Sequence, residues 1–131
     1  MSGLLDGKAA AITGAVSGIG RAIALEYLRQ GASVAVNHLG DEWSENHFKS
    51  MVLEANPGHR LISVPGDISK PETANKLIEK TVKAFGKLDI FVSNAGICTF
   101  ADFLQYVRDD LHWYLLTRRE LDLTAINLSL P

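Results

Sequence analysis

Hydrophobic residues in the N-terminal part of the chain follow two spacings in turn. Short apolar runs predict β-strands at residues 8–13, 33–37, 61–64 and 88–92. Apolar positions every three to four residues predict helices at residues 18–30 and 42–55, and a third helix that opens with a capping box at residues 69–72 and ends at Gly86. This strand–helix alternation is typical of a parallel sheet with crossover helices.

The same periodicity predicts which side of each helix faces the sheet. Arg21 is expected on the outer, solvated face of the first helix. The inward-facing positions expected are Ile19, Ala22, Ile23 and Leu28 in the first helix, Trp43, Phe48, Met51, Val52 and Ala55 in the second, and Ala74, Leu77, Ile78, Val82 and Phe85 in the third.

Composition narrows the class of protein. The chain has 131 residues, of which 47% are hydrophobic and 21% charged, which suits one globular domain. A formal net charge of -2 gives no reason to expect binding to nucleic acid or to a membrane, so the expected partners are small molecules. No signal-peptide or membrane-spanning pattern is evident, so the expected location is the cytosol. Cys98 is the only cysteine, which excludes an internal disulfide and a thiolate metal site.

The strongest functional signal is a glycine-rich loop between the first strand and the first helix. Its sequence, TGAVSGIG at residues 13–20, places Gly14, Gly18 and Gly20 where a strand ends and a helix begins. Glycines let the backbone approach a pyrophosphate closely, and the free amides and dipole at a helix N-terminus favour negative charge. We therefore expect the loop to bind a nucleotide, and a larger side chain at any of the three glycines to interfere. The alternative is a tight turn with no ligand.

Three further motifs agree with this loop: Gly66-Asp67-Ile68, Leu88-Asp89, and Asn94-Ala95-Gly96-Ile97. With them, the chain resembles the short-chain dehydrogenase/reductase family from about residue 5 to residue 104. The resemblance implies an α/β fold with a Rossmann-like, doubly wound parallel sheet, here incomplete, with about four strands in the order 3-2-1-4. It also implies that Asp67 and Ile68 flank the adenine of a dinucleotide and that residues 94–96 line its ribose. Each has a plainer alternative: Asp67 as a turn residue, Asn94 as a satisfied buried amide, and Gly96 as a chain-reversal glycine.

The choice between NADP and NAD should be decided where the second strand ends. A carboxylate there would bond the adenosine 2′-hydroxyl and repel a 2′-phosphate. The strand instead ends in Asn37 and His38, so we expect NADP(H) in preference to NAD(H), with possible help from the cation of Arg21. An exposed loop histidine with no ligand is the alternative for His38. The complete set of cofactor-binding residues predicted is Gly14, Ser17, Gly18, Ile19, Gly20, Asn37, His38, Asp67, Ile68, Asn94, Ala95 and Gly96.

The catalytic residues of the family are missing from this sequence. The family uses a serine on the fifth strand and a Tyr-x-x-x-Lys helix. Here the residues four places after Tyr27, Tyr106 and Tyr114 are Gly31, Asp110 and Arg118. Arginine is not assumed to replace lysine, because its pKa and geometry differ. No catalytic residue is therefore assigned, and this chain is expected to be truncated before the active site and inactive alone.

The chain is expected to divide into a cofactor-binding half-domain at residues 1–104 and a divergent tail at residues 105–131. Residues 105–107 can be encoded by CAGTATGTN, which contains a common 5′ splice-site sequence, so one hypothesis is that the tail is a splicing or gene-model artefact. The alternative is a genuine tail with a helical stripe of Leu111, Tyr114 and Leu115.

Three functions stay open at this point. The first is an oxidoreductase acting on a carbonyl, a secondary alcohol or a sugar, supported by a similarity to the sugar 1-dehydrogenases of the family. The others are a non-catalytic dinucleotide-binding module and an interaction protein that pairs with an intact relative. In each case the fourth strand would be an exposed edge, which predicts self-association or poor solubility.

Overall fold

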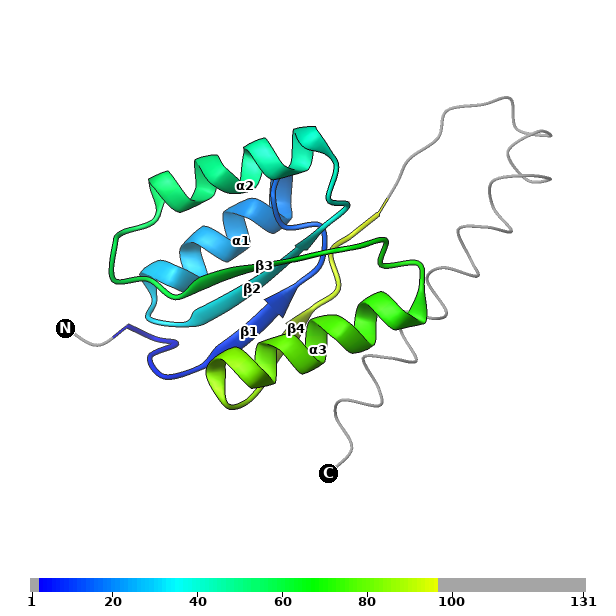
Figure 1. Ribbon diagram of the computed structural model, residues 1–131. Helices are drawn as coiled ribbons and strands as arrows, with labels where there is room; N and C mark the ends of the chain where they lie inside the picture. The colour runs from blue at the N-terminus through cyan, green and yellow to red at the C-terminus, as the bar shows by residue number, and fades with distance from the viewer. Residues whose placement is uncertain (1–2, 97–131) are drawn as a thin grey trace, which may run out of the picture.

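A computed structural model describes residues 3–96 of the chain. Four parallel strands form one sheet, with a helix between each pair of successive strands (Figure 1). The elements are β1 (Ala9–Ile12), α1 (Gly18–Arg29), β2 (Ser33–His38), α2 (Glu42–Glu54), β3 (Leu61–Pro65), α3 (Pro71–Phe85) and β4 (Ile90–Val92). The strand order β3-β2-β1-β4 confirms the predicted α/β topology.

The molecule has three layers, because successive strand residues point to opposite faces of the sheet. In Figure 1, α1 and α2 cover one face and α3 covers the other. On the first face, Ile12 and Val34 pack with Leu28 of α1 and Met51 of α2. On the second face, Ala11, Ala35 and Val64 pack with Leu77 of α3.

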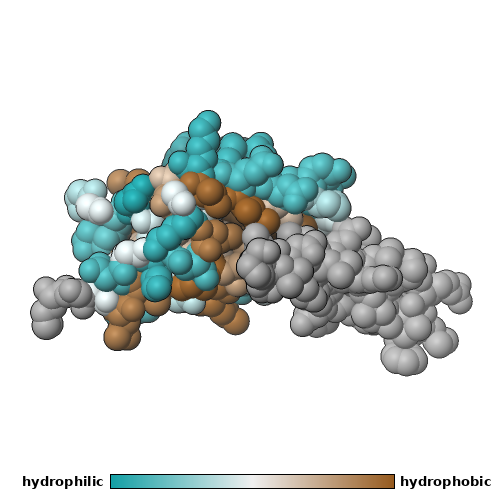
Figure 2. All heavy atoms as spheres, turned by 90° about the horizontal axis from the view of Figure 1, so that it is seen from below, coloured by the Kyte–Doolittle hydropathy of each residue, from teal (hydrophilic) through white to brown (hydrophobic). Residues whose placement is uncertain are grey.

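The centre and the edge of the sheet differ in burial. All four residues of β1 are buried, as expected for a parallel strand covered on both faces. The three residues of β4 are only partly buried, and within residues 3–96 this strand pairs with β1 alone. Seen from below in Figure 2, the molecule shows hydrophobic surface between hydrophilic regions.

The strand order places the functional loops together. β1 lies between β2 and β4. From β1 the chain adds β2 and β3 on one side of the sheet and then returns to add β4 on the other side. The loops that follow these three strands all leave from the carboxyl edge of the sheet. In open parallel sheets, ligands bind in the crevice at such a switch point.

The predicted capping box of α3 is wrong. The N-cap residue is Lys70, and its side chain makes no capping hydrogen bond. The hydroxyl of Ser69 instead donates to Asp67 Oδ1 at 2.7 Å, because the turn before the helix offers a closer acceptor. Pro71 does begin the helix, and Gly86, in the left-handed region at φ 81°, ends it as predicted.

Several predicted inward-facing residues are exposed. Ile19 is 75% exposed, Trp43 55%, Val52 50% and Val82 42%, and Ala22 is also exposed. The buried stripe of α1 consists of Gly20, Ala24 and Leu28, and that of α3 includes Thr81, whose hydroxyl donates to Leu77 O at 2.6 Å. A small or polar residue on the buried stripe is invisible to a search for apolar periodicity, which explains the error.

Some sequence predictions lie outside the described residues. These are the predictions for Cys98, for the end of the half-domain at residue 104 and for the tail at residues 105–131. Among residues 3–96, no helix has the length and apolar character needed to cross a membrane.

Candidate dinucleotide-binding site

The glycine-rich loop connects β1 to α1 at the carboxyl edge of the sheet, and two of its glycines are enclosed by protein. Gly14 has φ 60°, and a Cβ atom there would lie 2.9 Å from Ala95 Cα. Gly20 is buried, and a Cβ atom there would overlap Asn94 Nδ2 and lie 2.6 Å from Gly14 O. These two glycines therefore allow the loops after β1 and β4 to pack against each other.

The third glycine is different. Gly18 is the first residue of α1 and has φ 57°, yet a Cβ atom there would meet no atom of residues 3–96 within 4 Å. The amides of the first helical turn have no preceding turn to receive them, so they are available to a ligand. Neighbouring Ile19 is exposed, and the side chain of Ser17, the N-cap, makes no capping hydrogen bond. The open side of the loop thus combines free amide donors, a hydroxyl and an apolar side chain.

A hydroxyl that the site prediction omitted joins two of the predicted segments. Thr13 is fully buried, and its Oγ1 accepts from Asn94 N at 3.0 Å and from Ala95 N at 2.9 Å. Asn94 Nδ2 in turn donates to Thr13 O at 3.2 Å and Gly14 O at 3.1 Å. The Asn94 amide is thus hydrogen-bonded, as the plainer alternative of a satisfied buried amide requires, although Asn94 is only partly buried. Gly96 is exposed, and its φ is not in the left-handed region that favours glycine.

The end of β2 is connected to the same loop. Ala15 N donates to Asn37 O at 3.1 Å, which joins the glycine loop to β2. The Asn37 side chain is buried, and its Nδ2 donates to Val64 O and Gly66 O, both at 3.1 Å. The donors of this amide are therefore directed at β3 and the turn after it.

His38 is also buried, with 3% of its surface exposed, so the alternative of an exposed loop histidine is wrong. Nε2 lies 2.7 Å from Ser63 Oγ, and Nδ1 accepts from Gly40 N at 3.1 Å. Burial lowers the pKa of His38 below its ordinary value of 6.5, although the carboxylates of Glu45 and Asp41 act in the opposite direction. The ring is therefore neutral near pH 7.

Asp67 and Ile68 lie in the turn after β3. Asp67 Oδ1 accepts from Ser69 N at 2.9 Å and from Ser69 Oγ at 2.7 Å, so the residue forms an Asx turn. These bonds lower the pKa of Asp67 below its ordinary value of 3.8, and it is ionised at neutral pH. Ile68 is half-buried and packs against the core on the α3 side.

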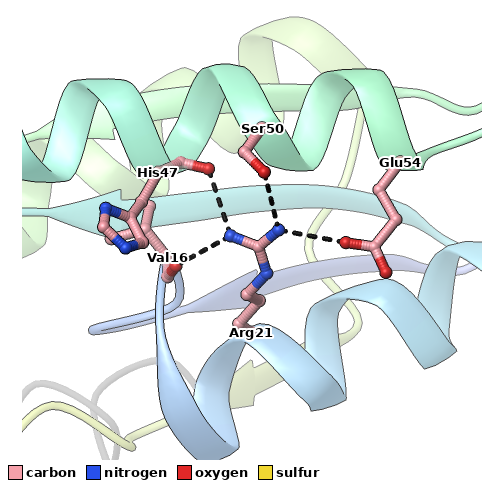
Figure 3. Close-up of polar contacts among 5 residues, drawn as sticks. All are labelled: Val16, Arg21, His47, Ser50 and Glu54. Atoms are coloured by element: carbon pink, nitrogen blue, oxygen red, sulfur yellow. Dashed lines mark hydrogen bonds and ion pairs between the residues drawn. The ribbon is translucent and has the colours of Figure 1, made fainter.

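Arg21 does not have the solvated position predicted for it. Its guanidinium donates to Val16 O, His47 O and Ser50 Oγ, and pairs with Glu54 Oε2 at 3.0 Å (Figure 3). The side chain, 20% exposed, lies between α1 and α2 and binds the two helices together. Its donors are directed at protein acceptors, so the structure offers no support for a contact with a 2′-phosphate.

The contacts show which predicted residues are brought together. Hydrogen bonds run from Asn94 to Thr13, from Ala15 to Asn37, and from Gly66 to His38 O, so every predicted segment lies along one edge of the sheet. The donor set fits a phosphate-containing dinucleotide, because it offers helix N-terminal amides beside an uncrowded glycine. The described residues contain no group of three potential metal ligands.

Comparison with protein families identifies relatives of the chain. The short chain dehydrogenase family model matches residues 8–117, which extends past the half-domain boundary expected at residue 104. L-rhamnose-1-dehydrogenase of Scheffersomyces stipitis is 48% identical over 112 residues, which are 85% of this chain and 43% of the relative. The L-rhamnose 1-dehydrogenase (NAD(P)(+)) of Sphingomonas sp. is 46% identical over 102 residues, 77% of this chain and 39% of the relative.

Solved structures give the same result. A short chain dehydrogenase from Burkholderia cenocepacia, crystallised in complex with NADP, has a TM-score of 0.80 and 28% identity, covering 95% of this chain and 51% of that one. L-sorbose reductase from Gluconobacter frateurii, complexed with NADPH and L-sorbose, has a TM-score of 0.76 and 29% identity, covering 98% and 47%.

The chain therefore spans about two fifths of the length of these curated relatives and about half of the solved chains. The family match and the sequence identities confirm the predicted resemblance, including the similarity to sugar dehydrogenases. The fold, the glycine loop and the relatives agree that this chain belongs to the short-chain dehydrogenase/reductase family.

Proposed function

We propose that this chain is the dinucleotide-binding part of an oxidoreductase and that it holds the cofactor pyrophosphate at the N-terminus of α1. The observation that carries the proposal is the contrast among the loop glycines. Protein atoms fill the space beside Gly14 and Gly20, whereas no atom of the described part of the chain fills the space beside Gly18. A glycine with no protein neighbour, at the start of a helix with free amides, is where a phosphate can approach the backbone.

The remaining site residues would hold the other parts of the dinucleotide. Ser17 and Ile19 are proposed to contact it beside Gly18, Asp67 and Ile68 to flank the adenine, and residues 94–96 to line the ribose. The nicotinamide dinucleotide supplies hydride chemistry when it is bound. This chain's residues bind and orient it, and none of them is proposed to transfer a proton.

We propose NADP(H) as the preferred cofactor. β2 ends in Asn37 and His38, and neither brings a negative charge at neutral pH against a 2′-phosphate. The relatives support the class of cofactor, since one solved relative was crystallised with NADP and another with NADPH. The curated relative from Sphingomonas sp. is named for use of NAD(P)(+).

The substrate class follows from the relatives and is also a proposal. Two curated relatives are L-rhamnose 1-dehydrogenases, and one solved relative is a sugar reductase bound to L-sorbose. We propose that a protein containing this domain acts on a sugar or on another secondary alcohol or carbonyl. Because the 131 residues contain no Tyr-x-x-x-Lys motif, the chain alone is expected to produce no NADPH from NADP⁺ and L-rhamnose. Turnover by the purified chain would contradict this.

The binding proposal is tested by titrating the chain with NADPH and with NADH and following nucleotide fluorescence. The test variant is Gly18→Ala, and the matched control is Gly7→Ala. Gly7 has a similar φ of 74°, and among the described residues a Cβ atom there would also meet no atom within 4 Å, but the residue lies before β1 and away from the loop. We expect Gly18→Ala to weaken NADPH binding by about tenfold or more, a loss of roughly 1.4 kcal/mol, and Gly7→Ala to leave it unchanged.

Three outcomes would contradict the proposal. An unmodified chain that binds neither nucleotide would remove the binding function. Equal affinities for the Gly18→Ala and Gly7→Ala variants would show that the pyrophosphate is not held at α1. Tighter binding of NADH than of NADPH would overturn the cofactor preference alone.

A further inference from the structure

The histidine at the end of β2 has both ring nitrogens engaged. Gly40 N can only donate, so Nδ1 of His38 must hold a lone pair, and the proton of the neutral ring lies on Nε2. Nε2–H then donates to Ser63 Oγ on β3, at 2.7 Å. The ring is 3% exposed and stacks on Phe48 of α2 with 6.0 Å between the centroids. A neutral imidazole with its proton on Nε2 therefore makes both hydrogen bonds.

The ring fixes the backbone between β2 and α2. Gly40 has φ 86°, in the left-handed region, and its amide is held by His38 Nδ1. The next residue, Asp41, caps α2 by accepting from Ser44 N at 2.8 Å. Hydrogen bonds therefore hold this segment, residues 39–41, at two successive residues, Gly40 and Asp41. They follow the strand whose end is joined to the glycine loop by the hydrogen bond from Ala15 N to Asn37 O.

Protonation of the ring is incompatible with this arrangement. A proton on Nδ1 would face the Gly40 N–H, and two donors cannot share a hydrogen bond. The charged groups that act on the ring are the carboxylates of Asp41 and Glu45 on the α2 side, while Ser63 on the β3 side is neutral. Desolvation of the ring has a larger effect on its pKa than these carboxylates, so the pKa of His38 lies below 6.5. At neutral pH the ring is therefore uncharged and makes both hydrogen bonds.

We propose that His38 is a positioning residue whose neutral ring holds residues 39–41 in the shape that receives the adenosine end of the dinucleotide, and that protonation releases this loop. The role rests on the proposed dinucleotide-binding function. In this role the His38 ring acts by holding the Gly40 amide, and it does not act as a cation that contacts a 2′-phosphate. The two roles predict opposite effects of pH: release of the loop weakens binding as pH falls, whereas a cationic contact strengthens it.

The experiment uses NMR and nucleotide titration on the full 131-residue chain, from about pH 7.5 to about pH 5, with the variants His38→Asn and His38→Ala. Asparagine is the conservative variant, because its side-chain oxygen can accept from the amide two residues later and does not titrate. In the unmodified chain, we expect the Gly40 amide to lose its protection from hydrogen exchange, and both NADPH and NADH affinity to fall, as His38 is protonated.

The variants separate the positioning role from a general structural one. His38→Asn is expected to keep Gly40 protected and to make NADH affinity independent of pH over this range. His38→Ala is expected to lose Gly40 protection at every pH and, at about pH 7.5, to bind both nucleotides about fivefold more weakly than the unmodified chain, the effect of one typical hydrogen bond. As His38 of the unmodified chain is protonated, the affinities of the two chains are expected to converge. NADH is included because its lack of a 2′-phosphate removes the titration of that group from the comparison.

Other results would overturn the proposal. NADPH affinity that rises as pH falls in the unmodified chain, and no longer rises in His38→Asn, would assign a cationic contact to His38. Nucleotide affinities in His38→Ala equal to those of the unmodified chain at about pH 7.5 would remove the positioning role and leave the proposed function intact. Failure of the unmodified chain to bind either nucleotide would overturn both, whatever the state of Gly40.

Discussion

The inner wall and the outer rim of the glycine loop use the same residue type for different purposes. The inner wall consists of Thr13, Gly14, Gly20 and Asn94, which are joined by hydrogen bonds and by contacts too close for a Cβ atom. The outer rim consists of Ser17, Gly18 and Ile19, where a Cβ atom at the glycine would meet none of the atoms in residues 3–96. Two of the three glycines therefore allow the loops after β1 and β4 to pack closely, and the third leaves an unfilled space on the outer side of the loop.

The largest effect on stability is expected at the inner wall, from Thr13→Val. Valine has a similar shape but no oxygen, so the amides of Asn94 and Ala95 lose their acceptor. A buried donor without a partner costs roughly 1–3 kcal/mol, and two are affected here. Chemical denaturation should show this loss in the free energy of unfolding. Thr13→Ser keeps the oxygen and is the matched control; equal stabilities of the two variants would show that the hydroxyl is not needed.

Gly20→Ala is expected to have the next largest effect. The added methyl group would overlap Asn94 Nδ2 and Gly14 O, and overpacking of this kind costs about 1–3 kcal/mol. The control is Gly58→Ala, because no atom of the part of the chain that the structure describes lies within 4 Å of a Cβ at that position. Unfolding curves that coincide for the two variants would contradict the close approach of the loops after β1 and β4.

Arg21→Gln tests a residue that the sequence analysis placed on the solvated face of the first helix, as a candidate contact of a 2′-phosphate, and that the structure places between α1 and α2. Loss of its bonds to α2 should lower the free energy of unfolding by about 1 kcal/mol, the net worth of a typical hydrogen bond. The ratio of NADPH to NADH affinity should not change. Glu54→Gln, which removes only a partly exposed ion pair, should cost less. A change in the ratio of NADPH to NADH affinity would indicate that Arg21 contacts the cofactor.

The sequence predicted the fold well because the relevant signals are local. Apolar runs, helix-ending glycines and turn residues lie within each element, and they predicted all four strands. The order of the strands was predicted from the family resemblance, and the structure confirms it. The segments that form the site were predicted for the same reason, because each motif is contiguous in the sequence. The contact between Thr13 and Asn94, which are 81 positions apart, was missed because a hydroxyl reveals its partner only after folding. Arg21 was misplaced because the carbonyl of His47 and the side chain of Ser50 are acceptors that no helical pattern marks.

The smallest effect expected is the pH dependence contributed by Asp67. Its pKa is lower in the folded chain than in the unfolded one, so its stabilising effect is complete above the ordinary value of 3.8 and is lost as pH falls through that value towards the folded-state pKa. Asp67→Asn keeps an acceptor for Ser69 N but does not titrate. The stability difference between the two chains should therefore change between about pH 5 and about pH 3. A constant difference over that range would contradict the ionised Asx turn.

The most direct test of the proposed phosphate site is to follow the backbone amides of the 131-residue chain by NMR during titration with NADPH. We expect the largest chemical-shift changes at Gly18, Ile19 and Gly20, with smaller changes in residues 38–41 and at Asp67 and Ile68, and none near the C-terminus of α3. Shifts centred on another surface, or no shift in the first turn of α1, would contradict the claim that the open rim of the loop is the phosphate site.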